Sequence, residues 1–493
     1  MPPVKPVRLV ALVAAPSLLA VLACSAAPPA ASLAPAPSVA PVAVSATPVL
    51  AVNPPPLQPR ELRMIAAVSR VPKIAEEVAA IRHLPLKHPV PAAEQTQEDF
   101  KRYLDAQIKK ELPPEKAAAS VRALVRLGLL ARPIDLGKTV EDAMITQAGA
   151  YYDPDTKKFY LVIVPEDASM LDVMSAHELT HALDDQYFDL DAYTEDPSHT
   201  LSSDAEQARR FVAEGEATLV MIAYQAKVAA HQDIFDPRNL PMERAMVGAF
   251  AELDSEKVAQ AAAENPAVVA QLGPELKTSI DAMSAIPPFI LDPLFGAYTK
   301  GAAAVGAVRD AGGWDAVAEL YTNPPESTEQ MLHPIDKLIT HRDHPVAITF
   351  APLPKSLAGW TELDQDVLGE LSMAVYFKNL HDPRPAAEVT GWGGDRYVAY
   401  ANGDKVVGLW MTTWDTEKDA RRFFDAYAGG LPRRFDGDKA YKRSGSAVEA
   451  GVRHKDGTLT GAQLSGKDVR IVDGADTAMA PGLFTWLATS TKK

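Results

Sequence analysis

The chain has 493 residues, with 49 Lys and Arg against 64 Asp and Glu, and hydrophobic residues make up 47% of it. The length allows two or three domains with substantial cores, and the net charge of -15 opposes nonspecific binding to nucleic acid or to anionic lipid. The single cysteine, Cys24, excludes disulfide frameworks and cysteine-based metal sites.

Residues 1–23 predict an export signal. A short basic N-terminus precedes an apolar run that ends at Cys24, is interrupted by Pro16, and is too short for a comfortable transmembrane span. The segment Val21-Leu22-Ala23-Cys24 resembles the bacterial lipobox, in which the cysteine is lipidated and becomes the mature N-terminus. We therefore predict an extracytoplasmic protein whose Cys24 carries a lipid anchor in a bacterial membrane. Ser25, in place of an acidic residue, favours the outer membrane, and plain secretion or a short transmembrane anchor are the alternatives.

Residues 24–60 contain 10 Pro and 10 Ala, and no charged residue occurs before Arg60. Such a composition forms neither a packed core nor a regular helix. We predict a tether that holds the folded part away from the membrane, and a disordered remnant without function is the alternative.

Apolar residues at helical spacing predict helices through most of residues 61–130. Leu62, Ile65 and Val68 share one helix face, and Pro113-Pro114-Glu115 opens a further helix. We predict a helical N-terminal subdomain here. The pattern fits an inhibitory prodomain as well as an integral part of the fold.

Residues 131–348 are predicted to form one larger, mostly helical domain. The period changes near residue 150, where two β-type runs flank the turn Asp153-Pro154-Asp155-Thr156 and predict a hairpin over residues 150–164. Helical spacing then predicts helices over about residues 170–187 and 203–230. A small edge sheet thus leads directly into a pair of long helices.

Short β-type runs, an Asn-Gly-Asp turn and one amphipathic stretch predict a separate α+β domain over residues 349–493. Its predicted elements are a hairpin at 397–411, a helix at 416–427 and strands at 446–454 and 459–472. We interpret Trp392, Trp410 and Trp414 as packing residues rather than as a binding surface. The protein as a whole is predicted to belong to the α+β class.

The segment from His177 to His181 reads H-E-x-x-H and lies within the predicted helix at 170–187. Residues four apart share a helix face, so the imidazoles of His177 and His181 can converge on one ion while Glu178 lies beside it. Two neutral imidazoles and a carboxylate suit one Zn²⁺ ion and leave a position open for water. The apolar flanks indicate a largely buried helix, where two unpaired histidines would be costly.

A third ligand is expected from the second helix. Asp184 and Tyr187 stand where a metzincin would have Gly and His, which excludes that class. Glu214 lies in an otherwise apolar stretch and is the best candidate, because Gly215 beside it would allow the two helices to approach closely. Glu216 lies about 200° further round the helix and is expected to face solvent, although it remains the alternative ligand.

The segment HELTHALDDQ, followed by Glu214 in EGEAT, resembles the gluzincin clan of zinc metallopeptidases, whose thermolysin-like members take the third ligand from a glutamate on the next helix. A closer resemblance, over about residues 120–345, is to a group of uncharacterised bacterial metallopeptidase-like lipoproteins. They share a YDP strand, both helical motifs and the late segment PPESTEQMLHP. The resemblance implies that Gly149–Val164 contains the edge strand along which an extended peptide lies.

The resemblance also guides the remaining site residues. Thr218 stands where thermolysin has an aspartate that orients the first histidine, and Asp204 or Asp184 is the expected substitute. Gluzincins place a His or Tyr beyond the third ligand to stabilise the oxyanion, which makes His333 and Tyr298 the candidates here. Helix capping by His333 and core packing by Tyr298 are the alternative roles.

We therefore predict a membrane-tethered zinc metallopeptidase that acts on peptides or proteins and has no nucleic-acid partner. Zinc would activate a water molecule, and Glu178 would accept its proton and deliver it to the leaving amine. One alternative is a noncatalytic zincin-like scaffold that binds envelope proteins, against which the intact Glu178 argues. Another is a metal-dependent amidase that acts on a cell-wall bond. The sequence leaves the oligomeric state open.

Overall fold

The computed structural model describes residues 59–145, 149–162, 168–194, 200–254, 256, 257, 260, 264, 283 and 285–493, the last range without 437 and 444–447. The predicted signal peptide, Cys24 and nearly all of the predicted tether lie outside these residues. Pro59 and Arg60, which the prediction placed in the tether, already belong to the first helix. Within the described ranges, no helix is long and apolar enough to cross a membrane.

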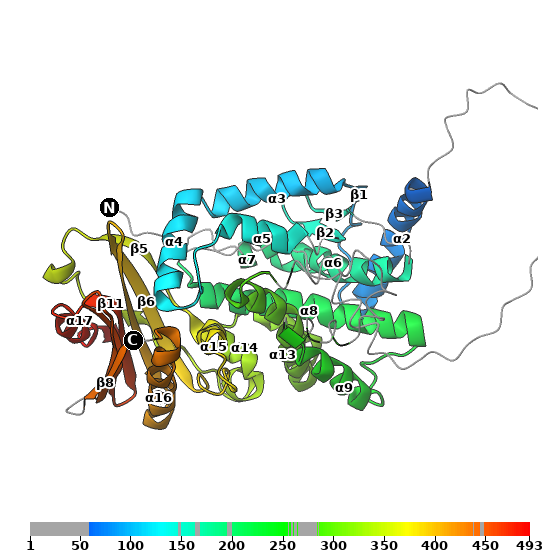
Figure 1. Ribbon diagram of the computed structural model, residues 1–493. Helices are drawn as coiled ribbons and strands as arrows, with labels where there is room; N and C mark the ends of the chain where they lie inside the picture. Colours follow the sequence, from blue (N-terminus) through cyan, green and yellow to red (C-terminus); the bar gives the residue numbers. More distant parts are fainter. Residues whose placement is uncertain are drawn as a thin grey trace, which may run out of the picture.

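The protein is α+β, as predicted, with a mostly helical part beside a C-terminal part built on a large sheet (Figure 1). Helices α6 (Ala168–Phe188), α8 (Ser203–Ala230) and α13 (Pro288–Thr322) form the centre of the helical part. The predicted helices at 170–187 and 203–230 are confirmed. The shorter helices of this part are α5 (Leu136–Ile145), α7 (Leu190–Thr194), α9 (Leu240–Ala251), α14 (Thr328–Leu332) and a π-helix at Ile335–Ile339.

Residues 59–130 contain three helices and one strand. They are α2 (Pro59–Arg82), β1 (Ala92–Glu94), α3 (Gln97–Glu111) and α4 (Pro114–Leu127). The predicted helical character is confirmed, whereas β1 was not predicted. α2 packs on α6 and α8, and α4 packs on the C-terminal sheet. Arg126 of α4 lies 3.4 Å from the carboxylate of Asp473 in that sheet. Contacts with both parts favour an integral segment over a removable prodomain.

A three-stranded sheet lies against α6. Strands β2 (Ala150–Asp153) and β3 (Lys158–Leu161) form the predicted antiparallel hairpin, although residues 163 and 164 of the prediction lie outside the described ranges. β1 pairs with β3 in parallel, which gives the order β1-β3-β2. β2 is therefore an edge strand, and its residues are all buried where it packs against α6.

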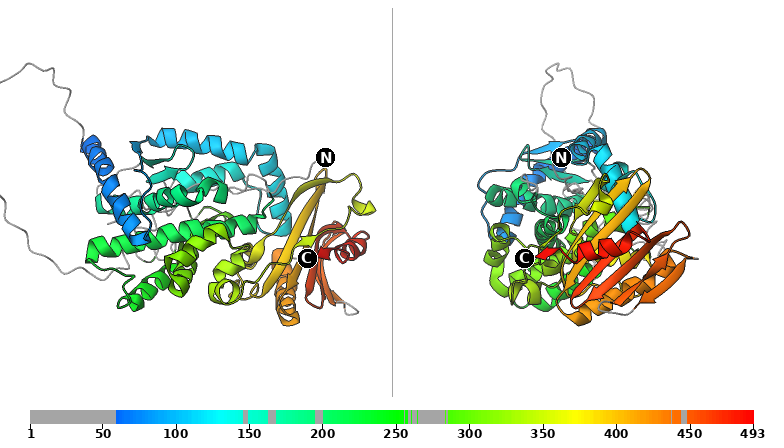
Figure 2. Two further views of the ribbon diagram at one scale, coloured as in Figure 1. Left: turned by 180° about the vertical axis from the view of Figure 1, so that it is seen from behind. Right: turned by 90° about the vertical axis from the view of Figure 1, so that its left-hand side faces the viewer.

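The C-terminal part is a seven-stranded antiparallel sheet of order β5-β6-β7-β11-β10-β9-β8 with helices packed against it (Figure 2). The strands are β5 (Thr361–Asp366), β6 (Trp392–Asn402), β7 (Lys405–Trp414), β8 (Lys439–Arg443), β9 (Val448–Arg453), β10 (Thr458–Ser465) and β11 (Asp468–Asp476). The helices are α15 (Gly369–Asn379), α16 (Glu417–Arg434), α17 (Ala480–Leu487) and a 3-10 turn at Lys355–Leu357. The predicted hairpin at 397–411 is confirmed. The single strand predicted at 459–472 is wrong, because Gly466, with a φ of 59°, turns the chain between β10 and β11.

The two faces of this sheet carry separate apolar clusters. On β7, Val407, Leu409 and Met411 join the cluster beneath α17, while Trp410 lies 5.8 Å from Phe423 of α16 on the other face. Alternation along the strand thus supplies side chains to both layers. The interpretation of Trp392, Trp410 and Trp414 as packing residues is confirmed, because all three are buried.

Several contacts join the C-terminal part to the helices. Asp366, at the end of β5, accepts hydrogen bonds from the backbone N–H of Ser203, at 3.1 Å, and from its hydroxyl. Ser203 is the first residue of α8, so the large sheet holds the N-terminus of that helix. β4 (Ile348–Thr349) pairs with β12 (Thr491–Lys492), so the C-terminal part begins slightly before the predicted boundary at residue 349.

Candidate metal centre

The two histidines of the H-E-x-x-H motif lie one turn apart on α6 and are both buried. Their Nε2 atoms are 3.2 Å apart, with the rings close to perpendicular. The four-residue spacing therefore brings two imidazole nitrogens close together, as predicted from the sequence.

Glu214 of α8 reaches the same point. Its Oε2 lies 3.1 Å from His177 Nε2 and 3.3 Å from His181 Nε2. Ligands at the corners of a tetrahedron around zinc, with bonds of 2.0–2.2 Å, are separated by about 3.4 Å. The triangle of His177, His181 and Glu214, here termed the His–His–Glu cluster, thus has dimensions that fit this ion. One imidazole nitrogen of each histidine and one carboxylate oxygen of Glu214 lie close enough together to bind a single ion.

Glu216 does not face solvent, so that part of the prediction is wrong. Its carboxylate is fully buried and forms an ion pair with Arg82, the last residue of α2, which is itself buried. Tyr321 of α13 donates a hydrogen bond of 3.0 Å to the other carboxylate oxygen. The two carboxylates of the EGE segment therefore point to different partners, and Glu216 belongs to an ion pair that joins α2 to α8.

Gly215 also has a different role from the one predicted. A Cβ atom there would collide with the backbone of Gly301 in α13 rather than with α6. A Cβ at Gly301 would in turn lie 2.6 Å from the carbonyl oxygen of Phe211. The pair of glycines thus lets the backbones of α8 and α13 touch. One turn before Gly301, Tyr298 stacks its ring on that of His177, with centroids 5.5 Å apart.

Glu178 lies beside the cluster and is completely buried. Its Oε2 accepts a hydrogen bond of 3.0 Å from the backbone N–H of Tyr152 in β2, and its Oε1 has no partner among the described residues. Burial raises the pKa of Glu178 to about 8. The edge strand therefore holds one oxygen of this carboxylate and leaves the other available. No local pattern in the sequence indicates the hydrogen bond from Tyr152 to Glu178.

The cluster perturbs the pKa values of its own members. Burial lowers the pKa of His177, because the charged imidazolium loses its solvent. Burial opposes the charged form of His181 as well, but the charge of Glu214 outweighs it and raises the pKa of His181 to about 9. Burial likewise opposes ionisation of Glu214, yet His181 and His177 hold its pKa well below the usual range. The Glu214 carboxylate is thus ionised, and a metal bound here would displace the proton that this charge holds on His181.

Neither carboxylate proposed to orient the histidines is bonded to one of them in the described part of the chain. Asp204 accepts hydrogen bonds from the Thr328 hydroxyl, at 2.5 Å, and from its backbone N–H, at 3.2 Å. It therefore holds the first residue of α14, and its predicted orienting role is not supported. Asp184 lies near the ion pair of Arg82 and Glu216, and its Oδ2 accepts a hydrogen bond of 3.4 Å from Tyr321.

His333 lies away from the cluster. Its Nε2 is 2.9 Å from the carboxylate of Glu370 in α15, and both residues line a different cavity from the one that contains His181 and Glu214. The segment around it has a structural explanation, because Ser327 caps α14 and Thr328 binds Asp204. Of the two predicted oxyanion donors, the structure brings only Tyr298 to the cluster.

A second group of carboxylates, Glu329, Asp343 and Asp415, also converges in the described part of the chain. The ammonium group of Lys337 lies 2.5 Å from Asp343 and from Asp415 and 3.2 Å from Glu329. A lysine therefore already supplies the positive charge at the centre of this group, which identifies it as an ion-pair network and not as a metal site.

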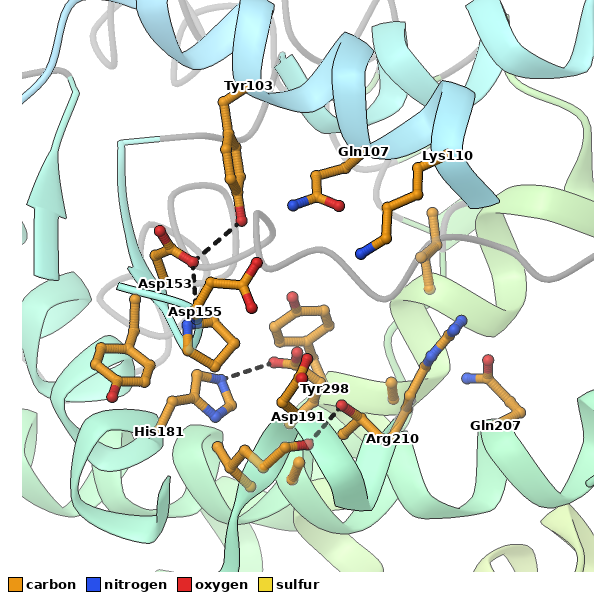
Figure 3. A pocket seen from close by; sticks show the side chains of 18 residues that line it. Tyr103, Gln107, Lys110, Asp153, Asp155, His181, Asp191, Gln207, Arg210 and Tyr298 are labelled. Carbon is orange, nitrogen blue, oxygen red and sulfur yellow. Dashed lines mark hydrogen bonds and ion pairs between the residues drawn. The ribbon is translucent and has the colours of Figure 1, made fainter. Parts of the chain in front are cut away.

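The cavity at the His–His–Glu cluster has a volume of about 90 Å³ (Figure 3). His181 and Glu214 form part of its floor, and α3, the β2–β3 turn, α7 and α13 supply the remaining walls. The side chains that line it outside the cluster include Tyr103, Gln107, Lys110, Asp153, Asp155, Asp191, Arg210 and Tyr298. The residues from α3 and α7 were not predicted, because nothing in their local sequence indicates which cavity they reach.

Comparison with known families identifies one match. A family described as a domain of unknown function (DUF8575) matches residues 356–483, which contain all seven strands of the C-terminal sheet. Searches of curated proteins and of solved structures found no match.

Asp395 in the matched segment accepts hydrogen bonds from both Trp392 and Trp410 and from the backbone N–H groups of Leu368 and Gly369. Residues 392–396 thus tie β6 to the start of α15.

Proposed function

We propose that the protein is a zinc-dependent peptidase in which His177, His181 and Glu214 bind the metal. The observation that carries this proposal is the triangle of ligand atoms, with sides of 3.1 to 3.3 Å, in a cavity next to an unshared carboxylate oxygen. Two imidazoles and one carboxylate leave a coordination position for water, as in catalytic rather than structural zinc sites. When bound, zinc would acidify that water and polarise a carbonyl group.

Glu178 is the proposed general base. It lies next to His177 on the buried face of α6, and the N–H of Tyr152 fixes its orientation. Its Oε1 is free to accept a proton and to return it to the leaving amine. Tyr298 is the proposed donor to the oxyanion, because its ring stacks on His177 and lines the cavity.

The proposed peptide seat is the edge of β2 that pairs with no other strand. Because Tyr152 directs its N–H away from β3 and toward Glu178, the polar backbone groups of this residue face the cluster. An extended peptide placed along an unpaired sheet edge gains backbone hydrogen bonds whatever its side chains are. We further propose that the enzyme is exported and anchored through a lipid on Cys24.

We expect the protein to cleave a diverse peptide library only when zinc is bound. A chelator should remove cleavage, and one equivalent of zinc should restore it, because the proposed ligands form one site. Mass spectrometry of the products, beside metal analysis of the protein, is the measurement. Cleavage that persists at full rate in metal-free protein would refute the proposal.

Glu214→Gln should weaken zinc binding by at least tenfold, because the substitution removes the anionic ligand and keeps the shape of the side chain. Isothermal titration with zinc measures the effect. Glu206→Gln, two turns earlier on the same helix, is the matched control and should bind zinc as the wild type does. Equal zinc affinity of the Glu214→Gln and wild-type proteins would remove Glu214 from the ligand set.

A further inference from the structure

Helix α3 crosses the cavity on the side opposite α8. Tyr103, Gln107 and Lys110 lie on successive turns of α3 and line the cavity, and in Figure 3 their side chains point from α3 toward the floor that carries His181. The cavity volume of about 90 Å³ is well below the ~300–1,000 Å³ of pockets that enclose a drug-sized ligand. A substrate that reaches the cluster therefore meets α3 within a short distance.

This helix is fastened to the edge strand. The hydroxyl of Tyr103 donates a hydrogen bond of 3.4 Å to Asp153, the last residue of β2. The rings of Phe100 and Tyr103 lie 5.1 and 5.5 Å from that of Tyr151 in the same strand. Thr96 caps the start of α3, directly after β1 has paired with β3. The position of α3 over the cavity is thus a fixed feature of the fold.

The same contact ends the unpaired edge of β2. The strand has four residues, which span about 13 Å in an extended chain. A peptide paired with β2 runs along this distance and then meets Tyr103 where it contacts Asp153. On this side of the cluster the substrate chain must therefore stop or turn away.

We propose that α3 restricts the substrate to peptides with a chain end close to the cleaved bond, with Tyr103, Gln107 and Lys110 setting the length allowed on that side. This inference rests on the proposed peptidase function. It assigns the protein to the enzymes that trim chain ends or short peptides, and it excludes internal cleavage of long chains. The blocking residues come from the N-terminal segment, which is thereby part of the substrate site.

The test uses the zinc-loaded protein and peptides that share one cleaved sequence and are extended residue by residue at either end. We expect kcat/KM to fall at least tenfold once one end, and only that end, passes a fixed length. N-acetylated and C-amidated copies of the shortest good substrate show whether an amino or a carboxyl terminus lies under α3. Calorimetric Kd values of the same peptides for the Glu178→Gln protein should show the same length limit without turnover.

Variants of α3 supply the control. Lys110→Ala and Tyr103→Ala should each raise the rate of cleavage of over-length peptides several-fold. Lys110 is exposed, so its replacement should leave the fold intact. Lys109→Ala is the matched control, because Lys109 points to solvent and pairs with Asp105. Equal cleavage and equal binding of short and long peptides would overturn the restriction and leave the peptidase proposal intact. No cleavage of any peptide would overturn both.

Discussion

Replacing Glu178 by Gln should lower kcat for peptide cleavage by about 10²–10⁴-fold, the usual contribution of a general base. The amide has the shape of the carboxylate, and its oxygen can still accept the hydrogen bond from the N–H of Tyr152. What the amide loses is the ability to accept a proton at Oε1. Zinc affinity should stay within about threefold of the wild type, because Glu178 is not one of the three cluster residues.

Steady-state kinetics on one cleaved peptide, with metal analysis of both proteins, measures this effect. Glu98→Gln, on the exposed face of α3, is the control for a neutralised carboxylate and should leave kcat unchanged. A Glu178→Gln enzyme that retains more than a tenth of wild-type kcat would remove Glu178 from the role of base. Loss of zinc from that variant would instead make Glu178 a contributor to metal binding.

Glu216→Ala should destabilise the protein by about 3–5 kcal/mol, the typical loss when one partner of a buried ion pair is removed. The substitution leaves the guanidinium of Arg82, only 1% exposed, without its ion-pair partner. It also removes the acceptor of the hydrogen bond from Tyr321. The sequence alone would predict no effect, because it places Glu216 at the surface.

The control for this variant is Glu77→Ala. Glu77 of α2 pairs with Lys227 of α8, so it joins the same two helices, but both side chains are partly exposed. Exposed pairs contribute about 0–1 kcal/mol, so its melting temperature should change little. Thermal unfolding compares the two variants.

Combining Glu216→Leu with Arg82→Met should recover most of the lost stability, because no buried charge of this pair then remains. Equal melting temperatures for Glu216→Ala and Glu77→Ala would contradict the assignment.

Local periodicity was sufficient to predict the helices and strands that carry the proposed site residues. The helices at 168–188 and 203–230 and the hairpin before them follow from spacing and turn residues within each segment. The convergence of His177 and His181 is likewise a property of one helix. Features that depend on a single segment were therefore predictable from the sequence.

The incorrect predictions at the site depend on partners distant in the sequence. Arg82, which buries Glu216, is 134 residues earlier in the chain. Gly215 meets Gly301 of α13, and His333 meets Glu370 of α15, in each case through a helix whose placement no local pattern encodes. The sequence of a helix shows which residues share a face. Which face is buried, and against which element, depends on the packing partners.

The contact between Gly215 and Gly301 has an evolutionary consequence. Tyr298 and Glu214 take their places beside His177 because two helix backbones touch at this crossing, where no rotamer change can compensate for an added atom. In homologous chains that keep the His–His–Glu cluster, both positions should therefore remain glycine even where the surrounding apolar residues diverge. A search profile that requires this pair, 86 residues apart, together with the two helical motifs would separate true relatives from chance occurrences of H-E-x-x-H.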